Sequence, residues 1–167
     1  MRVLVTAASR HGGTREIGAH IAAELRSRGH EAELIDPENV VTLDRYDAVV
    51  LGSAVYTGHW LATAREFADR FAAELTQRPV WLLSSGLATA PAAAANSPAE
   101  TRALIDATRA RGHRAFGGRL DRSALNVAER AIVAAAQGKE GDHRDMAAVA
   151  SWARTISDDL ARMSVPA

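Results

Sequence analysis

The sequence of 167 residues contains no cysteine, and its formal net charge at pH 7 is zero because 20 Lys and Arg residues match 20 Asp and Glu residues. The lack of cysteine excludes disulfides, thiolate metal ligands and a cysteine nucleophile, and it suits a cytoplasmic protein. The lack of net charge removes the basic field that would attract nucleic acid or anionic lipid, so we expect no nucleic-acid partner. Any catalysis must use other side chains.

Long apolar runs are also missing. The run that ends at Ala8 is too short for the core of a signal peptide, and Gly12 and Gly13 follow it closely. No later run approaches the roughly 20 residues of a membrane-spanning helix, so no transmembrane segment is expected. Because 47% of the residues are hydrophobic, the chain can still bury a sizeable core. We expect one domain over residues 1–167.

Short apolar runs recur along the chain at intervals. These runs are rich in β-branched and aliphatic residues, and they predict strands at residues 3–5, 32–35, 48–51, 80–83 and 114–120. Gly117 and Gly118 interrupt the last run, which weakens the prediction there. Five strands are therefore expected.

Helical patterns fill the intervals between these strands. The first begins at Thr14, where apolar residues start to recur every fourth position, and Gly29 is its expected stop. Further helices are predicted at residues 61–75, 100–111, 123–137 and 145–163, whereas the alanine-rich residues 88–95 are expected to form a loop or an irregular helix. Strands that alternate with helices imply right-handed crossovers. We therefore expect an α/β, three-layer, doubly wound fold with a parallel sheet.

The loop after the first strand carries the first candidate site. In an open parallel sheet, ligands bind beyond the carboxyl ends of the strands, and backbone N–H groups at a helix start favour an anion there. The alternative is an ordinary turn in which Ser9 or Thr14 caps the helix. The place of this loop within a complete strand pattern favours a phosphate-binding loop made of Ser9, Arg10, His11, Gly12, Gly13 and Thr14. Neither a Gly-Lys-Ser/Thr sequence nor a Gly-x-Gly-x-x-Gly fingerprint occurs, which argues against ATP, GTP and NAD.

Two more loops are expected at the same edge of the sheet. Residues 52–60 follow the third strand, and Tyr56 is the better candidate to stack on a planar ring, whereas Trp60 is expected to anchor the loop onto the following helix. The fourth strand ends in small residues whose backbone amides suit the edge of a flavin ring, although an ordinary strand-end turn is the alternative. The candidates in these two loops are Ala54, Val55, Tyr56, Thr57, Gly58, His59, Ser84, Ser85 and Gly86.

Together the three loops resemble the flavodoxin family, whose five-stranded parallel sheet has the order 2-1-3-4-5. In that family they hold the phosphate of FMN, shield its isoalloxazine ring and contact the edge of the ring. The resemblance therefore implies FMN as the cofactor. Two departures stand out: His11 replaces a usual threonine, and the loop after Ser85 lacks a second stacking aromatic. The second departure leaves one face of the flavin more open to a substrate.

The C-terminal third is similar to the branch of the family that contains menaquinone-dependent protoporphyrinogen IX dehydrogenase. The similar segments are residues 117–120, 129–130, 140–145 and Trp152. This likeness implies a flavin that takes electrons from a reduced organic substrate and passes them to a quinone. The charged residues Asp142, Arg144 and Asp145 have an alternative role as an ordinary charged helix start.

We therefore expect an FMN-dependent oxidoreductase that acts on a small-molecule substrate or a quinone. An electron-carrier flavodoxin that serves a redox partner protein is one alternative, although carriers use an acidic docking surface that this balanced chain lacks. A flavin-free binding module with the same fold is another, and a homodimer stays open. The histidines have no metal-ligand spacing, so no metal is expected, and no side chain is identifiable as an acid or base.

Overall fold

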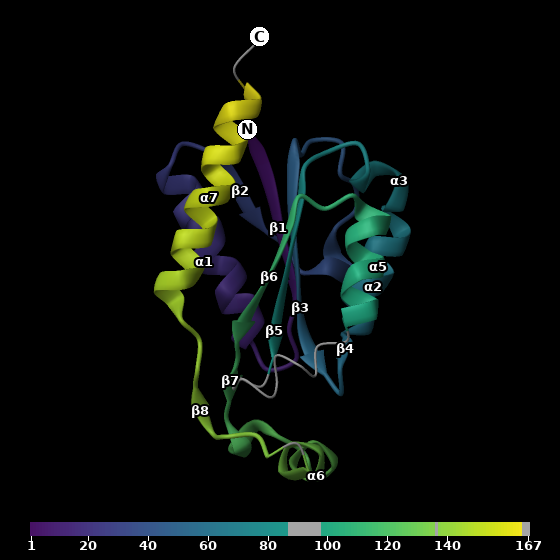
Figure 1. Cartoon of the computed structure of the whole chain (residues 1–167), viewed down its shortest axis with the longest axis vertical. Helices are drawn as coiled ribbons and strands as arrows, with labels where there is room; N and C mark the ends of the chain where they lie inside the picture. The colour runs from purple at the N-terminus through teal and green to yellow at the C-terminus, as the bar shows by residue number, and fades with distance from the viewer. Residues whose placement is uncertain (87–97, 136, 165–167) are drawn as a thin grey trace.

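The computed structural model describes residues 1–86, 98–135 and 137–164. Its central parallel sheet (Figure 1) has the order β2-β1-β3-β5-β6. The strands are β1 (Arg2–Ala8), β2 (Glu31–Leu34), β3 (Ala48–Tyr56), β5 (Val80–Gly86) and β6 (Gly112–Gly117). This path confirms the predicted order 2-1-3-4-5. A short strand, β4 (His59–Trp60), pairs antiparallel with β3, so the sheet has six strands where five were expected.

Helices cover both faces of the sheet (Figure 1). The helices α1 (Gly13–Ser27) and α7 (Met146–Ser164) lie on one face, and α2 (Ala62–Arg70), α3 (Ala72–Leu75) and α5 (Pro98–Thr108) lie on the other. A short 3-10 helix, η1 (Pro37–Asn39), follows β2. The three-layer, doubly wound fold is thus confirmed.

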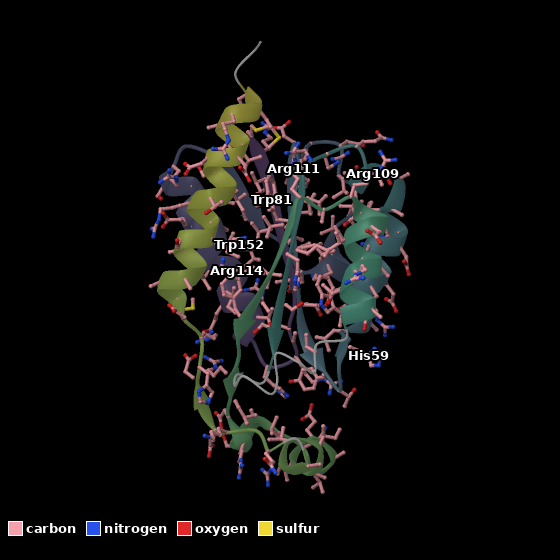
Figure 2. All side chains as sticks on the ribbon, viewed as in Figure 1. His59, Trp81, Arg109, Arg111, Arg114 and Trp152 are labelled. Carbon is pink, nitrogen blue, oxygen red and sulfur yellow. The ribbon has the colours of Figure 1, made fainter. Side chains whose placement is uncertain are left out.

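The two cores follow from the alternation of side chains along the central strands. Val5 faces α1 and α7, whereas its neighbour Leu4 faces the α2 side, and both are fully buried. Trp81 and Trp152 join the first core, between the sheet and α7 (Figure 2). The predicted stop of α1 is also confirmed, because Gly29 adopts a left-handed conformation with φ of 88° just after the helix.

Two predicted elements differ from the structure on the α2 side. The single helix expected at residues 61–75 is broken at Phe71, whose backbone leaves helical geometry between α2 and α3. The loop expected at residues 52–60 is a β-hairpin: β3 continues to Tyr56, and Thr57 and Gly58 form a left-handed turn into β4. The polar and small residues of this stretch concealed the extension of the strand. The expected alanine-rich loop at residues 88–95 lies outside the described residues.

The last predicted strand is also shorter than expected. β6 begins two residues before the expected start and ends at Gly117. Here the chain passes close to other backbone segments: a Cβ on Gly117 would lie 2.2 Å from the carbonyl oxygen of His143, and one on Gly118 would lie 2.3 Å from that of Gly86. Only glycine permits these two approaches. The chain then leaves the sheet.

Residues 118–145, called the distal segment below, extend beyond the carboxyl ends of the strands (Figure 1). They form β7 (Arg119–Leu120), a 3-10 helix η2 (Arg122–Ala124), α6 (Val127–Ala135) and β8 (Gly141–Asp142), with β7 and β8 paired antiparallel. The helix expected at residues 123–137 therefore begins only at Val127. Among the described residues, no helix is long and apolar enough to cross a membrane.

Candidate functional site

A pocket opens at the carboxyl end of the sheet, where β1, β3, β5 and the start of the distal segment meet. Its lining consists of Ser9, Arg10, His11, Gly13, Thr14, Ala54, Val55, Tyr56, Ser85, Gly86, Gly118 and Arg119. Ten of these residues are sequence-predicted candidates from three separate loops. The other two, Gly118 and Arg119, were missed as site residues, because only the path of the distal segment brings them back to the first loop.

The first loop leaves the start of α1 free to meet a ligand. Gly12 adopts a left-handed conformation with φ of 84°, and no side chain caps the helix. Among the described residues, no group accepts a hydrogen bond from the N–H of Gly13, Thr14 or Arg15. The alternative in which Ser9 or Thr14 caps the helix is therefore wrong. These N–H donors and the positive end of the helix dipole fit an anionic group such as a phosphate.

Two side chains of this loop are held by a carboxylate from the distal segment. Glu129 accepts a hydrogen bond from Nη1 of Arg10 at 2.9 Å and contacts Nε2 of His11 at 3.3 Å. The backbone N–H of Glu129 donates to Oδ1 of Asn126 at 2.8 Å, and the backbone N–H of Asn126 donates to the carboxylate of Glu129 at 2.9 Å. This reciprocal capping box at the start of α6 fixes the carboxylate in place.

The environment keeps Glu129 ionised. Only 7% of the residue is exposed. The N–H of Asn126, followed by the side chains of Arg10 and His11, lowers the pKa of the Glu129 carboxyl below its ordinary value despite the opposing effect of burial. Glu129 was noted in the sequence only for its family likeness, because nothing in the local pattern shows what the residue contacts across the fold.

Tyr56 supplies the aromatic surface of the pocket. It stands at the end of β3, and the guanidinium of Arg10 lies 4.8 Å from the centre of its ring. Burial raises the pKa of the Tyr56 hydroxyl, so the phenol is neutral at ordinary pH. A neutral aromatic ring beside a cation suits contact with a planar, anionic cofactor.

Five predicted candidates do not line the pocket: Gly12, Thr57, Gly58, His59 and Ser84. Ser84 is fully buried, where it accepts a hydrogen bond from the indole of Trp60 at 2.9 Å and pairs with His113 at 2.8 Å. Trp60 therefore anchors the hairpin to β5 through this hydrogen bond, and it also belongs to the core cluster on the α2 side. His59 points its ring at Glu100, 2.8 Å away.

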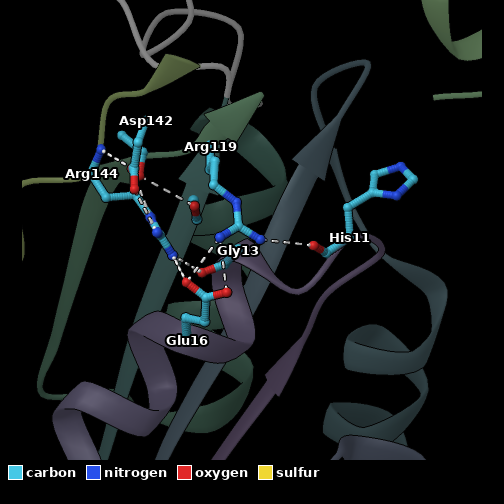
Figure 3. Close-up of polar contacts among 8 residues, drawn as sticks. His11, Gly13, Glu16, Arg119, Asp142 and Arg144 are labelled. Carbon is cyan, nitrogen blue, oxygen red and sulfur yellow. Dashed lines mark hydrogen bonds and ion pairs between the residues drawn. The ribbon is translucent and has the colours of Figure 1, made fainter. Parts of the chain in front are cut away.

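A row of alternating charges ties the distal segment to α1 (Figure 3). Arg144 is paired with Asp142 at 2.6 Å and with Glu16 at 2.6 Å, and it also donates to the carbonyl oxygen of Gly13. Arg119 continues the row by donating to Glu16 at 2.9 Å. The side chain of Arg144 is only 6% exposed, so this arginine is an internal clamp.

The pKa values reflect this clamp. The Arg144 guanidinium holds the pKa of the Asp142 carboxyl far below its usual range, and it also lowers the pKa of Glu16. The two carboxylates in turn raise the pKa of Arg144. Asp145 alone serves as a helix start, since it accepts the N–H of Ala148 at 2.9 Å. The helix-start alternative is therefore wrong for Asp142 and Arg144, whose side chains pair with each other and with Glu16.

The sequence model of the family described as "Flavodoxin domain" matches residues 4–147. The chain belongs to the flavodoxin domain family. This flavodoxin domain is 31% identical over 81 residues to the protein named protoporphyrinogen IX dehydrogenase [quinone] from Escherichia coli strain K12. That match covers 47% of this chain and 45% of the relative, so it spans about half the length of either protein.

Solved structures agree with the fold of this flavodoxin domain. Rubredoxin oxygen:oxidoreductase from Desulfovibrio gigas superimposes with a TM-score of 0.68 at 13% identity, over 98% of this chain and 37% of that one. Oxidised flavodoxin 1 from Bacillus cereus gives a TM-score of 0.57 at 18% identity, over 82% of this chain and 96% of that one. At these identities the likeness shows the fold alone.

Proposed function

We propose that this flavodoxin domain binds FMN in the pocket and transfers electrons from a reduced organic substrate to a quinone. The observation that carries the proposal is the convergence of three loops on one pocket that combines uncapped backbone donors with an aromatic ring. Dinucleotide-binding and ATP-binding loops have fingerprints that this sequence lacks.

The pocket residues divide into three groups by chemistry. The N–H groups of Gly13, Thr14 and Arg15, with the hydroxyls of Ser9 and Thr14, suit the phosphate. Tyr56 suits the face of the isoalloxazine ring. The backbone at Ser85 and Gly86 lies at the end of β5, where it can meet the polar edge of the ring. Bound FMN would supply the capacity to accept two electrons and to give them up again.

Two observations favour direct reaction with a small molecule over electron transfer to a partner protein. Residues 87–97 contain no aromatic side chain that could cover a second face of the ring, and the chain has no net negative charge for docking a basic partner. The name of the E. coli relative supports a quinone as the electron acceptor and protoporphyrinogen as the donor. The donor would lose two electrons and two protons at each turn, and the quinone would gain them.

The cofactor is tested on the purified protein. We expect apo-protein to take up FMN with quenching of its fluorescence, and mass spectrometry of the released cofactor to give the mass of FMN. Preferred uptake of FAD would overturn the choice of cofactor. Failure to bind any flavin would favour the flavin-free binding module.

The reaction is tested as two half-reactions by rapid mixing. The oxidised holoprotein is mixed with protoporphyrinogen IX, and the reduced holoprotein is mixed with menadione as a soluble quinone. We expect bleaching of the flavin absorbance in the first experiment and its return in the second. If neither occurs while a flavodoxin reductase reduces the bound flavin quickly, the protein is an electron carrier.

A further inference from the structure

Arg119 lies beside Gly13 on the wall of the pocket (Figure 3), and it is also close to Gly12. A Cβ on Gly12 would lie 3.9 Å from Nη2 of Arg119, and a Cβ on Gly13 would lie 3.6 Å from the Cβ of Arg119. The arginine comes from β7, more than 100 positions further along the chain. The distal segment thus delivers a cation to the loop that is proposed to hold the phosphate.

The hydrogen bonds of Arg119 orient its guanidinium and leave donors unused. Nη1 donates to both carboxylate oxygens of Glu16, at 2.9 and 3.2 Å, whereas Nη2 makes only a long contact of 3.4 Å to the carbonyl oxygen of His11. Within the described part of the chain, the Nε–H and the second N–H of Nη2 have no acceptor. A guanidinium carries five N–H groups, so donors remain for an anion.

The charges of Arg144 and Glu16, which lie next to Arg119, indicate what the Arg119 guanidinium does. Arg144 already pairs with two carboxylates, those of Asp142 and Glu16, and it also donates to the carbonyl oxygen of Gly13. Glu16 stands in the first turn of α1, where its negative charge would repel a phosphate. Arg119 sits between Glu16 and the loop, where it screens that repulsion. The positive charge of Arg119 therefore offsets the repulsion between Glu16 and any anion that the first loop binds.

We propose that Arg119 binds the phosphate of the flavin cofactor and that Glu16 and Arg144 act as positioning residues for it. This inference rests on the proposed binding of FMN. It adds that phosphate recognition depends on a cation from the distal segment, and that Arg119 makes the site select FMN over riboflavin. Because Arg119 is partly exposed, salt screens its contribution.

The test compares FMN and riboflavin as ligands of the wild type and of Arg119→Gln. We expect the dissociation constant of FMN to rise by about tenfold or more, as the loss of a charge-assisted hydrogen bond predicts, with that of riboflavin little changed. The affinity for FMN should also fall with added NaCl in the wild type and fall less in the variant. Arg154→Gln is the matched control, because Arg154 also pairs with a glutamate of α1, Glu24 at 3.3 Å, but does not line the pocket.

A second substitution separates a charge effect from a structural one. If Arg119 screens Glu16, then Glu16→Gln added to Arg119→Gln should recover part of the lost affinity for FMN. A merely structural role predicts a double variant no better than the single one. Unchanged binding of FMN in Arg119→Gln, or equal losses for FMN and riboflavin, would overturn this inference alone. If wild-type protein binds no FMN, the proposed function itself fails.

Discussion

The carboxylate of Glu129 lies 2.9 Å from Nη1 of Arg10, although 119 positions separate the two residues in the sequence. Arg10 belongs to the first loop of the sheet and Glu129 to α6 of the distal segment. The same carboxylate reaches His11, and Arg10 lies over the ring of Tyr56. The distal segment is therefore joined to the pocket by this cluster on one side and by the Arg144 clamp on the other.

Glu129→Gln should loosen the distal segment. Glutamine can still accept the N–H of Asn126, but it removes the charge that holds Arg10 and His11. Limited trypsin digestion checks this, because the segment carries the cleavage sites Arg122, Arg130 and Lys139. We expect faster cleavage there than in the wild type. Glu140→Gln, an exposed position in the same segment, is the control, because glutamine can still accept the N–H of Arg122 that Glu140 accepts at 3.3 Å. Equal rates in both variants would contradict the role of Glu129.

Tyr56→Ala should weaken FMN binding by about two- to tenfold, since aromatic stacking contributes roughly 0.5–1.5 kcal/mol beyond the area buried. The bound flavin should also regain fluorescence, because a stacked ring quenches it. Tyr56→Phe keeps the ring and should behave like the wild type in both respects. Fluorescence titration measures both quantities. If Tyr56→Ala quenches the flavin as strongly as the wild type does, the flavin does not stack on Tyr56.

Gly118→Ala should destabilise the fold, because its Cβ would lie 2.3 Å from the carbonyl oxygen of Gly86. Forced overpacking of this kind typically costs about 1–3 kcal/mol. Gly112→Ala is the matched control, since its Cβ would meet only Trp81, at an ordinary 3.6 Å. Thermal unfolding of both variants checks the expectation. A loss of stability no greater than that of Gly112→Ala would show that the chain can shift at Gly118.

The Arg144 clamp should make the protein sensitive to acid. The pKa of Asp142 is depressed in the folded state, so the unfolded chain binds more protons as the pH falls. The resulting stability is complete above the ordinary carboxyl range and is lost progressively below about pH 5. Urea unfolding at a series of pH values measures this loss. The fall in the free energy of unfolding between neutral and acid pH should be smaller in Asp142→Asn than in the wild type.

The control for the acid experiment is Asp106→Asn, at an exposed position of α5 whose side chain makes no ion pair within the described residues. This variant should lose stability with acid as steeply as the wild type does. Identical pH profiles for Asp142→Asn and the wild type would mean that the clamp contributes nothing to acid sensitivity.

The sequence alone was enough to predict the parallel sheet and the loops at its carboxyl edge, whereas the order of the strands came from the resemblance to the flavodoxin family. Buried parallel strands must be nearly continuous apolar runs, and helices between them must carry an apolar stripe, so both patterns are local and visible. Ser9, Thr14, Tyr56 and Ser85 could be named in advance for the same reason. Each lies at, or just beyond, the carboxyl end of a strand, which is the ligand edge of such a sheet.

Only the tertiary structure decided what the distal segment does. Its residues look like an interrupted strand, a helix and a charged helix start, because local patterns carry no information about partners that lie over 100 positions away. The fold brings Glu129 to Arg10 and Arg119 to Glu16, and it buries Arg144 between two carboxylates. The strength of such ion pairs depends on distance and burial, which are properties of the folded chain. For that reason the wall of the pocket beside Gly12 and Gly13 could be found only in three dimensions.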